Sequence, residues 1–322
     1  MAMRISKCVG LAGLALVLAI VPVRAQDYPA QDIHFICAFP PGSGADILVR
    51  YFAEKVRPLA GRNVIVENKP GAGGRIATES VIRAKPDGYT IFVNAGHGVA
   101  STQYFFKQPI DVVNTIRVAA TINRQPFMML VDAKKPYKTV AELTAALMPK
   151  GDKATFATSV TFGTVMGALY KQTTGLNAVE VNYKTAADSL NDVLSGTVDF
   201  AFQDPVYSLA QQREGRLRIL GISSGARMMA SPDLPTMTEQ GIPMDISGWW
   251  AAMVPAATPQ PIVDKINQWF VQVVSSPETK TFLNKNGGDP FVSTPEEAQA
   301  LFLKTNKDWE GYVRLAKIVP QG

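Results

Sequence analysis

The sequence contains few of the residues that bind metals or form disulfides. Among its 322 residues are two cysteines and two histidines, and Cys8 precedes an N-terminal apolar run that we expect to be removed. The other cysteine, Cys37, lies in an apolar, strand-like run, so we expect a buried thiol and no disulfide within the mature chain. Two isolated histidines without a carboxylate cluster make no ligand set for zinc or calcium, so no metal site is predicted.

The chain also lacks the features of nucleic-acid-binding and nucleotide-binding proteins. No segment combines clustered Lys and Arg with aromatic residues, which argues against nucleic acid as a partner. Two glycine-rich turns, residues 40–46 and 70–74, lack the third glycine of the dinucleotide fingerprint, because Ile47 and Ile76 occupy that place. Neither turn contains the Gly-Lys-Ser/Thr of a P-loop, so NAD, FAD and ATP are excluded and no cofactor is predicted.

Residues 1–25 have the pattern of a secretory signal peptide. Arg4 and Lys7 precede an apolar run over residues 9–21, and Ala25 is a small residue suited to cleavage. The run is shorter than the roughly 20 residues that span a membrane, so we expect export to the periplasm rather than a retained anchor. Removal lowers the number of basic residues from 32 to 29 against 27 acidic ones, and the net charge falls from +5 to +2.

The mature chain has the length and pattern of an α/β protein with two lobes. Its 297 residues exceed the size at which a single hydrophobic core usually stops growing. Short apolar runs alternate with amphipathic helical stripes, which indicates largely parallel sheets. We expect one lobe from residues 26–125 and 250–322 and the other from residues 126–249. Crossovers near residues 123–132 and 247–255 would then form a hinge around which the lobes close on a ligand.

Several helix starts and strands are clear in the sequence. Thr139 and Thr294 each begin a capping box, and Ser276 precedes a proline at a first helical position. Strands are predicted over residues 33–39, 63–67, 89–94, 154–157, 178–182, 198–202 and 217–223.

Each glycine-rich turn lies between a β-like run and a helical run, which is the arrangement of a backbone anion site. A turn without Cβ atoms lets main-chain N–H groups approach a ligand, and the following helix adds unsatisfied amides. A carboxylate or phosphate is therefore the expected ligand. Ser43 and Asp46 have capping-box spacing, so the Asp46 carboxylate can bond the Ser43 amide while Gly44 and Ala45 present their amides. Arg75 can meet a ligand carboxylate, with an exposed, solvated guanidinium as the alternative.

Further polar turns follow later strands. Residues 158–163 and Asp204 each come between a strand and a helix, and for Thr161 a helix cap is the alternative to ligand contact. His97 follows the third strand, where ligand contact and a solvated loop histidine are equal alternatives. Trp249 and Trp250 lie in the second crossover, where packing is favoured over stacking on a ligand ring.

A secreted serine hydrolase using Ser43 and His97 is the enzymatic alternative. The nucleophile elbow of such enzymes needs glycine two residues before and two residues after the serine, where this chain has Pro41 and Ala45. We therefore expect no enzymatic activity.

Six segments, in order across nearly the whole mature chain, carry a family resemblance: residues 39–46, 66–74, 85–90, 181–184, 233–237 and 248–251. In these segments the chain resembles the Bug family, the periplasmic substrate-binding receptors of tripartite tricarboxylate transporters. The resemblance implies a two-lobed periplasmic-binding-protein fold of the Venus-flytrap, type II-like kind, with a mixed sheet in each lobe and two hinge crossovers. It also implies a small organic carboxylate ligand and membrane permease subunits as partners. We expect a monomer that serves uptake, with a sensory receptor as the alternative.

The family's binding positions, combined with the turns above, give the predicted ligand-binding set. These residues are Phe39, Gly42, Ser43, Gly44, Ala45, Asp46, Gly73, Gly74, Arg75, His97, Thr158, Ser159, Thr161, Phe162 and Asp204.

The chain departs from the family pattern at several of these positions. Ser43 stands where the family commonly has a second glycine, and Arg75 where it has a small polar residue. In the turn at residues 158–163, Val160 and Phe162 are apolar and Thr164 takes the approximate place of a histidine. The changes at residues 160–164 predict a more apolar wall and a ligand with a ring or a longer hydrocarbon body that carries one or two carboxylates.

Overall fold

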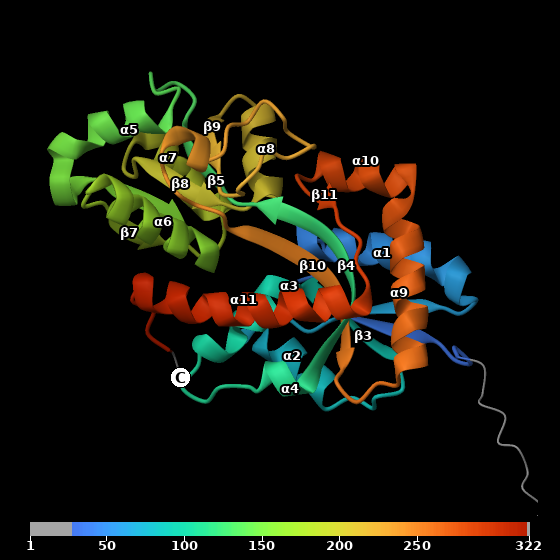
Figure 1. Cartoon of the computed structure of the whole chain (residues 1–322). Helices are drawn as coiled ribbons and strands as arrows, with labels where there is room; N and C mark the ends of the chain where they lie inside the picture. The colour runs from blue at the N-terminus through green and yellow to red at the C-terminus, as the bar shows by residue number, and fades with distance from the viewer. Residues whose placement is uncertain (1–27, 321–322) are drawn as a thin grey trace, which may run out of the picture.

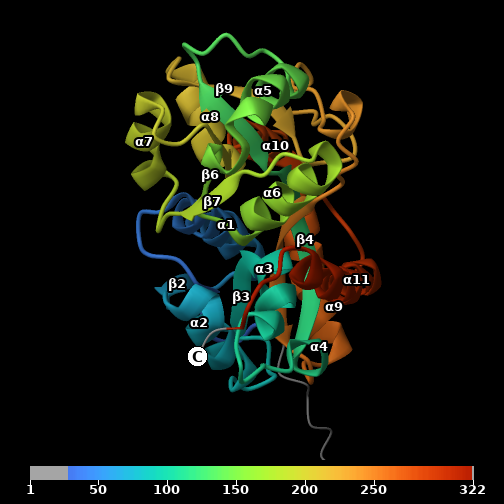
Figure 2. The same ribbon diagram turned by 90° about the vertical axis from the view of Figure 1, so that its left-hand side faces the viewer.

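Two separate β-sheets organise the chain into two lobes (Figures 1 and 2). The computed structural model describes residues 28–320, so the predicted signal peptide lies outside the described residues. Across the first sheet the strands are β11 (Asp289–Pro290), β4 (Ile116–Pro126), β10 (Ser247–Pro255), β3 (Thr90–Ala95), β1 (Ile33–Cys37) and β2 (Val64–Asn68). Across the second they are β7 (Val179–Asn182), β6 (Thr155–Thr158), β8 (Phe200–Gln203), β5 (Met128–Asp132) and β9 (Leu217–Ile222).

Both sheets are mixed, as predicted. In the first sheet β2, β1 and β3 are parallel, while β10, β4 and β11 add antiparallel pairs. In the second, β7, β6 and β8 are parallel and β5 pairs antiparallel with β8 and β9. Each predicted strand is present with its ends within two residues of the prediction.

Helices cover both sheets. In the first lobe they are α1 (Gly44–Ala60), α2 (Arg75–Ile82), α3 (Gly96–Ser101), α4 (Val112–Thr115), α9 (Gln260–Ser275), α10 (Pro277–Lys285) and α11 (Pro295–Leu315). In the second they are α5 (Val140–Leu147), α6 (Thr161–Thr174), α7 (Leu190–Ser195) and α8 (Pro205–Arg213). The predicted caps at Thr139, Ser276 and Thr294 are confirmed, and Thr294 forms the full capping box with Glu297. Within residues 28–320 we find no helix long and apolar enough to cross a membrane.

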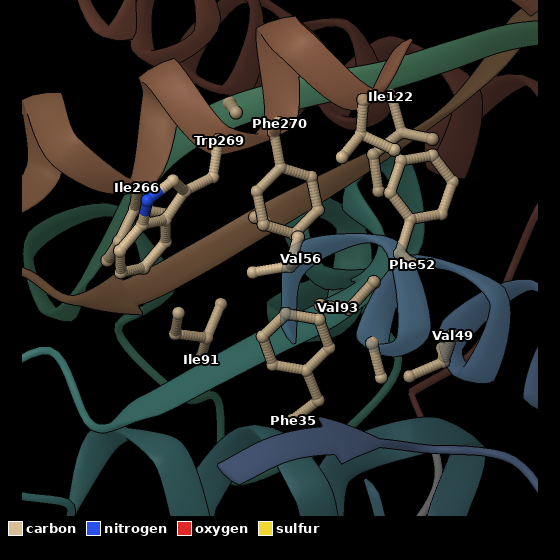
Figure 3. Packing of buried hydrophobic residues seen from close by; sticks show 14 of the residues in the cluster. Phe35, Val49, Phe52, Val56, Ile91, Val93, Ile122, Ile266, Trp269 and Phe270 are labelled. Carbon is tan, nitrogen blue, oxygen red and sulfur yellow. The ribbon is translucent and has the colours of Figure 1, made fainter. Parts of the chain in front are cut away.

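An aromatic cluster holds α1 and α9 on the first sheet. Figure 3 shows Phe35 of β1, Phe52 of α1 and Phe270 of α9 pointing toward one another. The ring centroid of Phe270 lies 5.9 Å from that of Phe35 and 5.6 Å from that of Phe52. All three side chains are fully buried, and each contributes about 1.5–3 kcal/mol by leaving water. This packing fixes the direction of α1 and therefore the place of its first turn.

The hinge consists of two antiparallel strands. β4 and β10 pair over their length and run toward the second lobe (Figure 1). β4 leads directly through Phe127 into β5, while the amide of Ile246, just before β10, donates to the carbonyl of Ser223 after β9. The chain thus passes between the sheets at the two predicted crossovers. The lobe boundaries at residues 125/126 and 249/250 stay predictions, because β4 runs through the first boundary and β10 through the second.

Helix α11 adds a connection between the lobes that the sequence did not indicate. At 21 residues it is about 30 Å long. Its residues Ala298 and Phe302 pack in the first lobe, and the Asn306 side chain donates to the Ala100 carbonyl at 2.6 Å. Trp309, farther along, packs in the apolar cluster of the second lobe, with its ring centroid 4.8 Å from that of Phe162. The chain therefore contacts the second lobe again after its second crossover.

Replacing Trp309 by alanine should lower the free energy of unfolding by about 3–5 kcal/mol, because it leaves a cavity at a side chain that is 1% exposed. Leu303→Ala on the same helix is the matched control, since Leu303 is 43% exposed and its loss should cost less than about 1 kcal/mol. Urea unfolding of the two variants measures the difference. Equal losses would mean that Trp309 does not join α11 to the second lobe.

Candidate functional site

The carboxyl ends of the parallel strands in the two lobes lie opposite each other. In the first lobe, the loops after β1, β2 and β3 leave one edge of the sheet, and in the second lobe the loops after β6, β7 and β8 do the same. The edges meet at two points. A Cβ atom on Gly44 would lie 3.6 Å from Val206, and the rings of His97 and Phe162 are 5.0 Å apart. We call the residues at these facing edges the interlobe site.

The predicted ligand-binding residues divide between the two edges. On the first-lobe edge lie Phe39, Gly42, Ser43, Gly44, Ala45, Asp46, Gly73, Gly74, Arg75 and His97. On the second-lobe edge lie Thr158, Ser159, Thr161, Phe162 and Asp204. Contact of these residues with a ligand stays a prediction.

Several helices that begin at the interlobe site lack a side-chain cap. α2, α3 and α6 have no side-chain cap, whereas α1 and α8, which also begin there, are capped by Ser43 and Asp204. Away from the site, α5, α10 and α11 are capped and α9 is not. At α6 the cap position is Val160 and Thr161 is the first helical residue, so the alternative of Thr161 as a cap is wrong. The first amides of an uncapped helix have no partner within the helix. At α2 the preceding turn takes the Arg75 amide, which donates to the Ala72 carbonyl. The helix starts that offer N–H donors are therefore α1, where the Ser43 hydroxyl takes only the Asp46 amide, and α3 in the first lobe, and α6 in the second.

Asp46 is bound entirely by groups of the first lobe. Its Oδ2 accepts from the Gly42 amide at 2.8 Å and from Arg50 Nε at 2.9 Å, and its Oδ1 accepts from Asn68 at 2.8 Å. Burial alone would raise the pKa of Asp46, but the hydrogen bonds from Arg50, Asn68 and the Gly42 amide outweigh it and lower the pKa to about 2. The predicted bond from Ser43 N to Asp46 is replaced by the bond from Gly42 N.

Of the predicted capping box at α1, the half made by Ser43 is confirmed. The Ser43 hydroxyl accepts from the Asp46 amide at 3.2 Å and donates to the Pro40 carbonyl at 2.8 Å. Because Arg50 neutralises Asp46, this carboxylate does not prevent an anion from approaching the amides of Gly44 and Ala45. The Ser43 proton is directed to a carbonyl rather than to an imidazole, which is unlike the nucleophile of a serine hydrolase.

Arg75 is bonded inside the first lobe. Its Nε donates to Glu79 at 2.7 Å, and its Nη1 donates to the carbonyl of Gln108 at 2.7 Å. The guanidinium also lies 5.0 Å from the ring centroid of Phe106. Arg75 is therefore held by three groups, and a ligand carboxylate would have to compete with Glu79 for it.

His97 is neutral and has a defined tautomer. Its Nδ1 lies 3.0 Å from the amide nitrogen and 3.1 Å from the carbonyl oxygen of Trp249. Since the amide nitrogen always carries hydrogen, Nδ1 must accept, and the ring proton lies on Nε2. Burial lowers the pKa of His97 to about 4, against the smaller opposing effect of the Trp249 backbone. At neutral pH the side chain therefore offers an uncharged N–H donor.

Aromatic rings form one wall where the lobes meet. The Phe162 ring centroid lies 4.8 Å from Phe127, 4.8 Å from Trp309 and 5.0 Å from His97. These rings come from α6, the β4–β5 junction, α11 and α3, so the wall joins both lobes. Trp249 and Trp250 are 2% and 6% exposed, which fits packing rather than ligand stacking.

The second-lobe edge carries a hydrogen-bonded polar chain. The Ser159 hydroxyl donates to Gln203 Oε1 at 2.6 Å, and Gln203 Nε2 donates to Ser189 at 3.3 Å. Asp204 caps α8 by accepting from the Tyr207 amide at 3.0 Å. Burial raises the pKa of Asp204, and the backbone amides at the start of α8 oppose that rise.

Three polar residues of the interlobe site were missed in the sequence: Asn68, Asn94 and Gln203. Each lies at or near the carboxyl end of a parallel strand, which is the signal that could have revealed them. Gln203 is fully buried, and the buried Oδ1 of Asn94 has no hydrogen-bond partner among the described residues. A buried acceptor without a partner needs a donor that comes from outside the chain, such as water or a ligand. Residues 28–320 contain no group of His, Cys, Asp and Glu arranged to hold a metal.

The protein-family model TctC, described as the tripartite tricarboxylate transporter family receptor, matches residues 48–315 of the sequence. The chain belongs to this family. BugT of Bordetella pertussis is 26% identical over 298 residues, which cover 91% of each protein. Among solved structures, the periplasmic binding protein BugD is 27% identical with a TM-score of 0.77, covering 91% of this chain and 100% of BugD. Rpa4515 of R. palustris with adipate shares the fold at 24% identity with a TM-score of 0.81, covering 92% of this chain and 100% of Rpa4515.

Family membership confirms the predicted relationship to the Bug proteins and the two-lobed α/β fold. It also confirms that the chain is a solute-binding receptor rather than an enzyme, so the hydrolase alternative is wrong. Receptors of this family work in the periplasm, which agrees with the predicted location.

His97→Gln should reduce the loss of stability in acid. Below pH 6.5 the unfolded chain binds a proton at His97, whereas the folded chain does so only near pH 4, so unfolding becomes more favourable as the pH falls. Between pH 7 and pH 4 the wild type should lose about 3 kcal/mol more than the variant. Urea unfolding across this range measures the loss. His34→Gln is the control, because it makes the same replacement at the other of the two histidines. If His97→Gln and His34→Gln lose as much as the wild type, His97 is not buried in its neutral form.

Proposed function

We propose that the protein binds a small organic mono- or dicarboxylate at the interlobe site and delivers it to a tripartite tricarboxylate-type membrane transporter. The observation that carries this proposal is the set of helix starts at facing sheet edges, α1 and α3 in one lobe and α6 in the other; α3 and α6 have no side-chain cap, and the Ser43 cap of α1 takes only the Asp46 amide. Helix N-termini bind anions through free amides and the positive end of the helix dipole. A dicarboxylate can place one charged group on each lobe, and so favours their closed arrangement.

Recognition is proposed to rely on neutral donors. Arg50 and Arg75 are each paired with a carboxylate of the first lobe, and His97 is uncharged at neutral pH. Backbone amides and the His97 Nε2 then supply the hydrogen bonds to the ligand. Such a site stabilises one or two carboxylates through neutral donors. It disfavours ligands with a higher negative charge, because the arginines near it are already paired with carboxylates.

The body of the ligand is proposed to be apolar. Phe162 lies against His97 and Phe127, and on the first-lobe edge Phe39 packs beside Trp250 with ring centroids 5.9 Å apart. These rings favour a hydrocarbon chain or an aromatic ring between the carboxylates. Adipate, the ligand bound to the structural neighbour Rpa4515, is the first compound to test.

The transporter partner and the monomeric state are parts of the same proposal. Family membership supports uptake, and a sensory receptor is the alternative that the same ligand site would serve. The closing motion is proposed to occur about β4 and β10, with residues 26–125 and 250–322 on one side and residues 126–249 on the other.

Gly44→Pro and Thr161→Pro test the amides directly. Each residue is the first of its helix, where proline fits but removes the N–H donor, and the preceding Ser43 and Val160 already have the extended backbone that proline requires. Each variant should bind adipate, or the best dicarboxylate from a thermal-shift screen, roughly 10- to 100-fold more weakly by calorimetric titration.

The matched controls are Gly44→Ala, which keeps the amide, and Thr161→Ser, which keeps both the amide and a hydroxyl. Both should bind within about threefold of the wild type, since only side-chain atoms change. If the proline variants and their controls bind alike, the helix-start amides do not hold the ligand. If no carboxylate shifts the midpoint of wild-type unfolding while amines or sugars do, the ligand class is wrong.

A further inference from the structure

Asp289 makes a two-point contact between the lobes away from the ligand site. It lies in β11, at the outer edge of the first sheet, and its Oδ2 and Oδ1 accept from the amides of Met229 and Ala230 in the second lobe. Both distances are 3.0 Å. Hydrogen bonds to an ionised carboxylate are stronger than neutral ones, so this contact favours the arrangement in which the lobes are together.

Both partners are fixed within their own lobes. On the first-lobe side, Asp289 lies opposite Arg124 in the antiparallel pairing of β11 with β4. Gly288 before it packs against the side chain of Asn123 so closely that a Cβ would not fit. On the second-lobe side, Met228 at the start of the turn is buried in an apolar cluster. The Ser231 amide closes the turn by donating to the Met228 carbonyl at 3.2 Å. The Asp289 carboxylate thus links two ordered bodies rather than two free loops.

Residues 287–289, which we call the interlobe segment, also touch α8, the helix that Asp204 caps. Gly287 has φ +74°, and a Cβ there would lie 2.7 Å from Pro205 and 2.8 Å from Leu209 of α8. On its other side, the same first turn of α8 meets Gly44 of α1 through Val206. The start of α8 is therefore held between the interlobe segment and the first-lobe edge of the ligand site.

The contact lies beside the hinge strand β4, with which β11 pairs, and it is open to solvent. A cavity of about 370 Å³ opens at this place, and its lining includes Asp289, Arg124, Gln125, Asp245 and Ser247. Asp245 lines the same cavity, but its Oδ1 accepts from the Gly225 amide at 2.8 Å, within the second lobe. Water can therefore replace the Met229 and Ala230 amides when the lobes separate, so the Asp289 contact can form and break with closure.

We propose that Asp289 is a positioning residue of the receptor, which raises ligand affinity by stabilising the closed arrangement of the lobes. The effect on affinity rests on the proposed function, while the effect on closure does not. A group that favours the binding-competent state raises apparent affinity by the factor by which it raises that state's population. Asp289 makes no contact with the ligand in this proposal.

The test compares Asp289→Asn and Asp289→Ala with Asp245→Asn. The last is a matched control because it removes a carboxylate bonded to a backbone amide in the same cavity, without joining the lobes. Without ligand, the Asp289 variants should show faster hydrogen exchange at the Met229 and Ala230 amides and a larger radius of gyration by X-ray scattering. With adipate they should bind roughly tenfold more weakly, mainly through faster dissociation. Asp245→Asn should match the wild type in all three measurements.

Unchanged exchange and scattering in both Asp289 variants would overturn the proposal. Equal changes in Asp245→Asn would also overturn it, because the effect would then come from the cavity and not from the link between the lobes. If the wild type binds no carboxylate but the Asp289 variants still open, the proposed function fails while the role of Asp289 in closure stands.

Discussion

Backbone amides at helix starts and turns are the groups on which this structure depends most. No hydrogen bond within a helix can satisfy them, and each one that is buried must find an acceptor elsewhere. Within the chain, carboxylates supply several of these acceptors: Asp46 binds the Gly42 amide, Asp204 the Tyr207 amide, and Asp289 the amides of Met229 and Ala230. The starts of α3 and α6 have no such side-chain acceptor. A ligand carboxylate would supply these helix starts with the same kind of acceptor that Asp46, Asp204 and Asp289 supply elsewhere in the chain.

The charged side chains around the site leave ligand binding to the backbone amides. Asp46 is ionised and paired with Arg50, so it fixes the first turn of α1 without presenting a net charge to the site. His97 is held neutral by burial, with Nδ1 bonded to the backbone of Trp249. The electrostatic character of the site then comes from helix dipoles and N–H groups, whose positions depend on the packing of helices against the sheets. The aromatic cluster around Phe270 and the wall around Phe162 therefore support the proposed site as well as the fold.

Local patterns in the sequence were enough to predict most elements of the fold. The capping residues Thr139, Ser276 and Thr294, the strand ends and the two crossovers each depend on residues close in sequence, and all are present. The facing edges also followed, because parallel strands bring their loops together. Features that join distant residues did not follow. Trp309 meets Phe162 and Asp289 meets Met229 only through the folded arrangement, and the spacing of Ser43 and Asp46 could not show that the Gly42 amide is the partner.

Amide chemical shifts show most directly whether amides from both lobes bind one carboxylate ligand. Titration of the isotopically labelled mature protein with adipate should move the N–H resonances of Gly44, His97, Thr161 and Phe162 together, with one saturation curve. The shifts should be downfield, since each amide gains a charged acceptor. Saturation with a dicarboxylate that leaves these four resonances in place, while resonances elsewhere move, would mean that the helix-start amides do not bind the ligand.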